Sequence, residues 1–246
     1  MRILFLGYEK RYEVLIKSLK EKNDIYVIGY DIKDQVKKGD LSNLDFYDII
    51  VLPMRGVNNL IVDGKNINGN IFENYKGKVY TGVKKDIKGN VESFLEDEEI
   101  VLENTLISVE GILDKITDLK KDNICILGYG KIGSMLYRKL KDKSIVFIGV
   151  KKEDDLKLDN SFLTTDIKQI EKVFKKCDLI INTVPNHIIE DKILKKYNKV
   201  FLDIASYPYG VDQDKVSKYP FYYQQYLSIP SKYAPERAGK ILLKKF

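Results

Sequence analysis

A glycine-rich stretch near the middle of the chain carries the clearest chemical signal in the sequence. Residues 128–133 have the spacing G-x-G-x-x-G and lie between the apolar run 124–127 and an amphipathic helical pattern. In such a unit the glycines give a tight turn, a close approach of pyrophosphate to the backbone, and close packing of helix on strand. The helix start also attracts phosphate through its free amide groups. The alternative is a turn kept for packing alone. We predict a dinucleotide site formed by Gly128, Gly130, Lys131, Ile132 and Gly133.

The residues about twenty positions beyond the turn indicate which nucleotide fits. An acidic residue at the end of the second strand normally binds the ribose 2′-hydroxyl of NAD. Here the strand runs into Lys151 and Lys152, and the first carboxylate is Glu153. Ammonium groups attract a 2′-phosphate, so the sequence favours NADP and leaves NAD as the alternative. If both lysines are only solvated, they carry no preference.

A polar strand end follows later in the same half of the chain. An apolar run is followed there by Asn182, Thr183 and Pro185. Ligands of open α/β sheets bind beyond the carboxyl ends of the strands, so we predict that these residues line the nicotinamide side. His187 is the only histidine and comes two residues later. It could serve as a general acid or base, although a lone loop histidine is more often incidental.

Several polar residues in loops after predicted strands are candidates for holding an anionic substrate. Arg11 and Arg55 each follow an apolar run of the first half. A guanidinium group binds a carboxylate through paired hydrogen bonds, although two isolated surface arginines would need no such role. Ser206 and Lys232 lie in two later loops that have the same character.

Strand-like apolar runs alternate with helical patterns through most of the chain. This alternation is typical of parallel sheets in an α/β fold. The predicted strands cover residues 2–6, 25–28, 48–52, 79–81, 124–127, 145–148, 179–181 and 200–204. An Asp-Gly pair at 63–64 indicates a hairpin turn.

The same patterns suggest two domains. A helical pattern over residues 97–121 separates the two sets of strands. We predict an N-terminal α/β substrate domain at 1–100, a connector helix at 101–121 and a Rossmann NAD(P)-binding domain at 122–234. A last helix, at 235–246, is expected to pack back on the N-terminal domain.

Composition narrows the classes of partner. The net charge of +6 comes from lysines spread along the chain, so we predict no nucleic-acid partner. No apolar run approaches the roughly 20 residues of a membrane span, and no signal peptide is evident, which predicts a cytoplasmic protein without membrane contact. Cys125 and Cys177 lie in or beside apolar runs, without zinc-ligand spacing. They are expected to be buried thiols, and no metal site is predicted.

The ordered set of motifs resembles the family of NAD(P)-binding subunits of dipicolinate synthase, over nearly the whole chain. The matching segments are Gly7 to Arg11, Tyr80-Thr81-Gly82, Asn104, Ser108 to Gly111, the glycine turn, Asn182 to Pro185, Asp203 to Ser206, and Ala234 to Gly239. The resemblance implies a flavodoxin-like domain and a Rossmann domain in a D-2-hydroxyacid-dehydrogenase-like arrangement.

The resemblance also implies an activity. A dihydro- or hydroxytetrahydro-dipicolinate would lose hydride to NAD(P) and become pyridine-2,6-dicarboxylate during sporulation. The second subunit of dipicolinate synthase, which is flavoprotein-like, would be the partner, and a homo-oligomer is possible. A cyclic dicarboxylate suits Arg11, Arg55 and Ser206, while Lys232 and Glu110 are the candidates for the catalytic proton acceptor.

Departures from the family pattern keep other functions open. Tyr209, Ser231 and Arg237 replace smaller or different residues of the family in loops expected near the substrate. A non-catalytic NADP-binding regulatory or scaffold subunit is one alternative, because a fold does not determine a function. Another NADP-dependent dehydrogenase of a small carboxylate is the second. The reaction of hydroxyacid dehydrogenases itself requires a histidine later in the sequence than His187, and the sequence has none.

Overall fold

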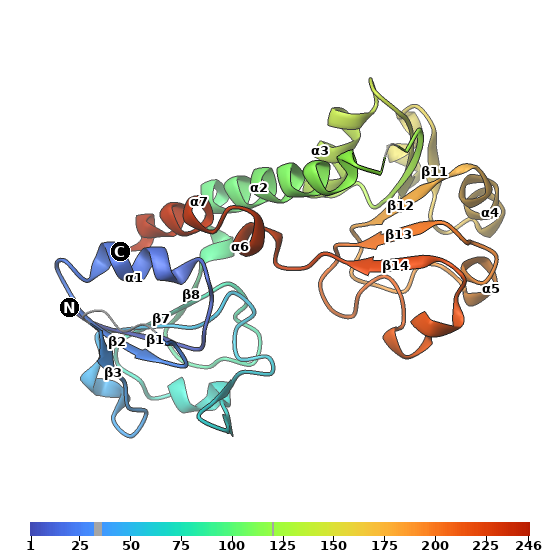
Figure 1. Ribbon diagram of the computed structural model, residues 1–246. Helices are drawn as coiled ribbons and strands as arrows, with labels where there is room; N and C mark the ends of the chain where they lie inside the picture. Colours follow the sequence, from blue (N-terminus) through green and yellow to red (C-terminus); the bar gives the residue numbers. More distant parts are fainter. Residues whose placement is uncertain (32–35, 120) are drawn as a thin grey trace. The chain divides into compact units, whose positions relative to one another are not determined.

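The structure, a computed structural model, describes residues 1–31, 36–119 and 121–246. They form two compact units, one made of residues 1–107 and 230–246 and the other of residues 108–229. Each unit contains a six-stranded parallel sheet with helices packed on it (Figure 1). The predicted α/β fold class is therefore confirmed.

The sheet of the first unit has the strand order β3-β2-β1-β4-β7-β8. Its strands are β1 (Arg2–Leu6), β2 (Asp24–Ile28), β3 (Lys37–Lys38), β4 (Ile49–Val51), β7 (Lys78–Thr81) and β8 (Val91–Ser93). Without the two-residue edge strand β3, this is the 2-1-3-4-5 order of flavodoxin-like domains. Apolar residues of β1 and its neighbours bury side chains on both faces, as parallel sheets require.

Helices cover one face of this sheet. Tyr12, Leu15 and Ile16 of α1 (Tyr12–Leu19) pack there together with Leu242 from the C-terminal segment. Helix α7 (Pro235–Lys240) packs against α1, because Gly239 has no side chain to hold the two helices apart. The other face is covered by loops and by the hairpin of β5 (Ile61–Val62) and β6 (Lys65–Asn66). Its turn lies at Asp63 and Gly64, as expected, and both have positive φ.

The second unit has the strand order β11-β10-β9-β12-β13-β14, with all strands parallel. This is the 3-2-1-4-5-6 order of the dinucleotide-binding Rossmann fold. The strands are β9 (Asn123–Leu127), β10 (Ile145–Val150), β11 (Ser161–Leu163), β12 (Leu179–Asn182), β13 (Val200–Asp203) and β14 (Tyr222–Gln225). The order reverses between β10 and β12, so the point beyond the end of β9 is where a ligand is expected.

Two layers of helices enclose this second sheet. Helix α3 (Lys131–Leu140) and the C-terminal half of α2 (Glu98–Thr117) pack on one face. Helices α4 (Ile167–Lys176) and α5 (Asp191–Leu194) pack on the other (Figure 1). The border between the units falls inside α2, and a second border falls in α6 (Ile229–Tyr233).

The structure differs from the expected elements mainly at sheet edges. Strands β3, β8, β11 and β14 were not predicted, and each is two to four residues long. The last helix is α-helical only to Lys240 and continues as a 3-10 helix to Lys245. Other 3-10 helices span Leu44–Phe46, Gly69–Phe72, Phe94–Glu96, Glu153–Lys157 and Gln213–Lys218. Within the described residues, no helix has the length and apolarity needed to cross a bilayer.

Candidate nucleotide-binding site

The glycine turn of the second unit has the geometry that its sequence predicts. Gly128 has φ +99°, a conformation that favours glycine, and its N–H donates a 2.9 Å hydrogen bond to the carbonyl of Gly149. A Cβ on Gly128 would come within 2.5 Å of Thr183 Oγ1, and one on Gly133 would collide with the carbonyl oxygen of Gly128. Around Gly130 a Cβ would meet nothing within 4 Å. Packing therefore requires two of the glycines, and the third leaves its backbone open to a ligand.

The start of α3 is suited to an anion. Gly130 is the N-cap and has no side chain, so no side-chain cap occupies the first amide groups, and Lys131 is exposed at the first helical position. The carbonyl of Gly130 accepts the first helical hydrogen bond, from Ser134 at 2.9 Å. Uncapped amides and the positive end of the helix dipole attract phosphate oxygens. The turn with Lys131 and Ile132 thus fits the pyrophosphate of a dinucleotide.

Lys151 and Lys152 lie beside this turn in the sheet. Strand β10 pairs with β9, and Gly149 of β10 accepts the hydrogen bond from Gly128. Both lysines follow directly after β10 and are exposed. The two residues therefore follow the strand whose end normally binds the ribose of a dinucleotide.

The polar end of β12 combines inward-facing residues with one exposed residue. Thr183 Oγ1 donates a 2.8 Å hydrogen bond to the carbonyl of Leu127, which fixes β12 against the glycine turn. The side chain of Asn182 is fully buried. Its amide donates a 2.9 Å hydrogen bond to the carbonyl of Val184, two residues further along the chain. Pro185 is exposed. Asn182 and Thr183 therefore fix the backbone at this strand end through inward-facing hydrogen bonds, whereas Pro185 is exposed.

A buried carboxylate organises the loops at the same edge. Asp203 ends β13 and is fully buried. It accepts hydrogen bonds from the Asn182 amide at 2.9 Å, from the N–H of Ala205 at 3.2 Å, from the N–H of Gly210 at 2.8 Å and from the Tyr223 hydroxyl at 2.8 Å. These four bonds tie the ends of β12 and β13, and the side chain of Tyr223 in β14, to the loop 204–210.

Tyr223 completes this cluster. Its hydroxyl also accepts a 2.9 Å hydrogen bond from the side-chain amide of Gln213. Burial, together with the negative charge of Asp203, raises the pKa of Tyr223 well above its usual value. The phenol therefore stays protonated and donates to the carboxylate. Sequence patterns pointed to the Asp203 loop but missed Tyr223, because a half-buried tyrosine in a short polar strand gives no sign of a contact with a buried carboxylate.

The other predicted residues of the second unit are exposed. Ser206 lies in the loop after Asp203, and Glu110 lies on α2. His187 has its Nε2 atom 3.1 Å from the carbonyl of Pro208, which joins the loop after β12 to the loop after β13. Among described residues, no group of three or more His, Cys, Asp or Glu side chains could hold a metal ion.

In the first unit Arg11 belongs to a buried polar cluster. Its side chain is nearly inaccessible, at 4% exposure. The guanidinium forms an ion pair with Glu9 at 2.5 Å and donates a 3.3 Å hydrogen bond to Asn104 Oδ1. Glu9 also accepts a 2.9 Å hydrogen bond from the N–H of Met54. Arg11 and Glu9 therefore join the loops after β1 and β4 to helix α2.

Arg55 and Lys232 have the opposite character. Both are exposed, and Arg55 makes a long hydrogen bond of 3.5 Å to the carbonyl of Asn59. Lys232 lies on α6. Each side chain could turn toward an anionic ligand without breaking a buried contact.

Comparison with known proteins agrees with this geometry. Residues 107–202 match a family described as the NAD binding domain of D-isomer specific 2-hydroxyacid dehydrogenases. The crystal structure of a dipicolinate synthase subunit from Bacillus halodurans superimposes with a TM-score of 0.76 at 21% identity, over 99% of this chain and 95% of that one. The fold is that of this dipicolinate synthase subunit.

Two further structures extend the comparison. The corresponding dipicolinate synthase chain from Bacillus subtilis gives a TM-score of 0.73 at 22% identity and covers 100% of this chain and 94% of that one. A D-isomer specific 2-hydroxyacid dehydrogenase from Xanthobacter autotrophicus Py2 gives 0.61 at 10% identity, covering 98% and 94%. No curated protein sequence matches the chain. The expected resemblance to dipicolinate synthase is thus confirmed at the level of the fold, which is of an NAD(P)-binding oxidoreductase type.

Proposed function

We propose that the protein is an NADP-dependent oxidoreductase that oxidises a cyclic dicarboxylate, dihydro- or hydroxytetrahydro-dipicolinate, to pyridine-2,6-dicarboxylate in sporulation. The observation that carries the proposal is the open glycine turn at Gly130, with Lys151 and Lys152 beside it, in a fold shared with a dipicolinate synthase subunit. NAD is the alternative cofactor. When bound, the nicotinamide accepts the hydride that the ring must lose.

The residues of this chain would bind and orient the nucleotide and the substrate, and one of them would take up the proton that the substrate loses. We propose that Lys131, Ile132 and the glycine turn hold the pyrophosphate, with Lys151 and Lys152 at the 2′-phosphate. Asn182, Thr183 and Pro185 would shape the nicotinamide side. Forming the aromatic ring from the dihydro compound releases one hydride and one proton. The hydroxytetrahydro compound must also lose its hydroxyl group as water. Lys232 and Glu110 remain the candidates that take up the proton.

For the substrate we propose Arg55 as the main carboxylate-binding residue. It is exposed, whereas Arg11 is ion-paired with Glu9 and hydrogen-bonded to Asn104. Arg11 would therefore stabilise the loops around it. Ser206 is a further candidate, because it is exposed beside the Asp203 cluster. We also propose that the first unit is the substrate domain, and that the flavoprotein-like second subunit of dipicolinate synthase is a partner in the reaction.

The test is a turnover assay with purified chain, alone and with that flavoprotein-like partner. NADP and freshly prepared cyclic substrate are supplied, and the reduced nicotinamide is followed by its absorbance. Turnover in either mixture is expected. With NADP below its saturating concentration, turnover should fall at least about tenfold in a Gly130→Ala variant that still folds. If neither mixture reduces the nucleotide although the chain binds it, the protein is a non-catalytic nucleotide-binding subunit. If another small carboxylate is oxidised instead, it is a different dehydrogenase.

A further inference from the structure

The second unit has a small hollow that is separate from the glycine turn. Its volume is about 190 Å³. The lining residues come from α4, from α5 and from the segment before β13: Glu171, Phe174, Lys175, Ile193, Lys196, Tyr197, Asn198 and Lys199. Lys199 directly precedes β13, and α4 leads into the start of β12. The hollow therefore lies toward the amino ends of the strands, whereas the glycine turn lies at a carboxyl end.

The floor of the hollow is apolar and its rim is basic. Phe174, Ile193 and Tyr197 are at most 4% exposed and belong to the core on this face of the sheet. The hydroxyl of Tyr197 is already used, since it donates a 2.9 Å hydrogen bond to the carbonyl of Val200. The rim carries Lys175, Lys196 and Lys199 together with Glu171. Lys196 pairs with Glu171 at 3.2 Å and Lys199 with Asp178 at 2.7 Å, so Lys175 is the rim lysine without a carboxylate partner among the described residues. Such a hollow accepts an apolar group and attracts negative charge around it.

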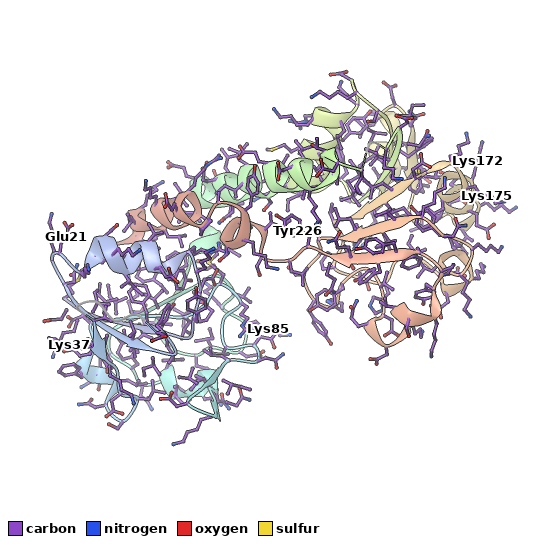
Figure 2. All side chains as sticks on the ribbon, in the orientation of Figure 1. Glu21, Lys37, Lys85, Lys172, Lys175 and Tyr226 are labelled. Atoms are coloured by element: carbon purple, nitrogen blue, oxygen red, sulfur yellow. The ribbon has the colours of Figure 1, made fainter. Side chains whose placement is uncertain are left out.

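Positive charge extends well beyond the rim. Residues 167–199 contain eight lysines and four carboxylates, a net charge of +4 in a chain with a total of +6. Within the described part of the chain, no ion pair involves the lysines at positions 168, 172, 175, 176 and 195. Lys172 and Lys175 extend from the outer side of α4 (Figure 2). The basic surface therefore extends over more residues than a small anion would contact.

We propose that this face of α4 and α5 binds an acidic segment of a partner protein, which inserts one apolar side chain into the hollow. Drug-sized ligands occupy about 300–1,000 Å³, so 190 Å³ suits a single side chain better. A buried apolar anchor surrounded by complementary charge is how compact protein interfaces gain affinity and specificity. A nucleic acid fits less well: its backbone has no apolar group for the floor, and bases stack on exposed rings, whereas Phe174 and Tyr197 are buried.

The experiment uses two fluorescein-labelled peptides, EDELEDE and EDESEDE, which differ only in the central residue. Binding to the full chain is measured by fluorescence anisotropy at low salt. The leucine peptide is expected to bind about tenfold more tightly than the serine peptide, because only leucine gains from burial in the hollow. Asn198→Trp, which places an indole at the rim from an exposed position, should remove this difference.

Charge is tested by a matched pair of reversals. Lys175→Glu should weaken the binding of both peptides about fivefold or more, whereas Lys139→Glu on α3 should change neither, although Lys139 is also exposed on a basic helix. Thermal unfolding shows that each variant is folded. Equal affinity for the two peptides, or a leucine preference that survives Asn198→Trp, would overturn the proposal. So would a labelled 20-mer of dT that binds more tightly than the leucine peptide and is lost in Lys175→Glu.

Discussion

The side-chain amide of Asn182 donates a 2.9 Å hydrogen bond to the carboxylate of Asp203, and both residues are fully buried at paired positions of β12 and β13. Three other donors complete the coordination of this carboxylate, from Ala205, Gly210 and Tyr223. A buried charge is stable only when its hydrogen-bonding positions are satisfied. The loops beside the candidate nicotinamide side therefore depend on one carboxylate for their conformation.

Replacing Asp203 by Asn should lower the free energy of unfolding by about 2–4 kcal/mol. The new amide would present N–H groups to donors that need an acceptor, and hydrogen bonds to a charged group are worth about 1.5–3 kcal/mol each. Urea denaturation of the full chain measures the loss. Asp142→Asn, at an exposed position, is the control and should stay within about 0.5 kcal/mol. Equal values for the two variants would contradict a structural role for Asp203.

Replacing Tyr223 by Phe should change how stability depends on pH. The pKa of Tyr223 is raised in the folded chain by burial and by Asp203, so its protonated form is favoured there. This contribution is fully present below the unfolded tyrosine pKa of about 10 and is lost as pH rises toward the folded value. Tyr223→Phe should be less stable than the parent at pH 7 but lose less stability between pH 9 and 11. Parallel curves would show that the phenol does not titrate differently on folding.

Substitutions at two glycines of the turn should distinguish effects on folding stability from effects on nucleotide affinity. Gly130→Ala adds a methyl group where nothing lies within 4 Å, at φ −78°, so its free energy of unfolding should change by less than about 0.5 kcal/mol. The same methyl group blocks the approach of a pyrophosphate, and NADP affinity should fall at least about tenfold. Gly133→Ala must displace the carbonyl of Gly128 and should destabilise the chain by about 1–3 kcal/mol. Calorimetry gives both quantities, and unchanged NADP affinity in Gly130→Ala would remove the turn from the binding site.

The two lysines after β10 should decide cofactor preference. Lys151→Glu combined with Lys152→Ala is expected to reduce NADP affinity about tenfold or more, because charged hydrogen bonds to the 2′-phosphate are lost. NAD affinity should stay within about twofold, since NAD has no such phosphate. Lys139→Glu combined with Lys141→Ala, at exposed positions of α3 and its end, makes the same change of charge and serves as the control. Equal loss of both nucleotides would assign the lysines no part in discrimination.

The two arginines of the first unit should behave differently. Arg11→Ala leaves Glu9 without its ion-pair partner in a largely buried site, which should cost about 3–5 kcal/mol of stability. Arg55→Ala removes an exposed side chain and should leave stability within about 0.5 kcal/mol. If Arg55 binds a substrate carboxylate, its loss should raise KM at least about tenfold with little change in Tm. An unchanged KM would leave Arg55 as a surface residue.

The glycine turn was predictable because its physical requirements are local. A turn at positive φ, an uncapped helix start and close helix–strand packing all fall within residues 124–140, and each limits the residue type in a recognisable way. Fully buried strands such as β9 and β12 were predictable for the same reason, since both faces must be apolar.

The Asp203 cluster could not be predicted in the same way. Its members lie up to 41 positions apart, at Asn182, Gly210 and Tyr223, and their meeting depends on the order of the strands in the sheet. Burial of Arg11 was equally hidden, because the sequence does not show that Asn104 would lie beside it. Edge strands such as β3 and β14 escaped prediction because short, half-exposed strands have little apolar pattern.

The return of residues 230–246 to the first unit has a consequence for the order in which the chain folds. Leu242 is fully buried in the core on the α1 side of that sheet, and Phe246 lies 5.3 Å from the Tyr80 ring, measured between ring centroids. The second unit is continuous in sequence, so a ribosome releases all of it before it releases these last residues. Domains generally fold as units as they emerge during synthesis. Of the two units, the one whose synthesis begins first is therefore completed second.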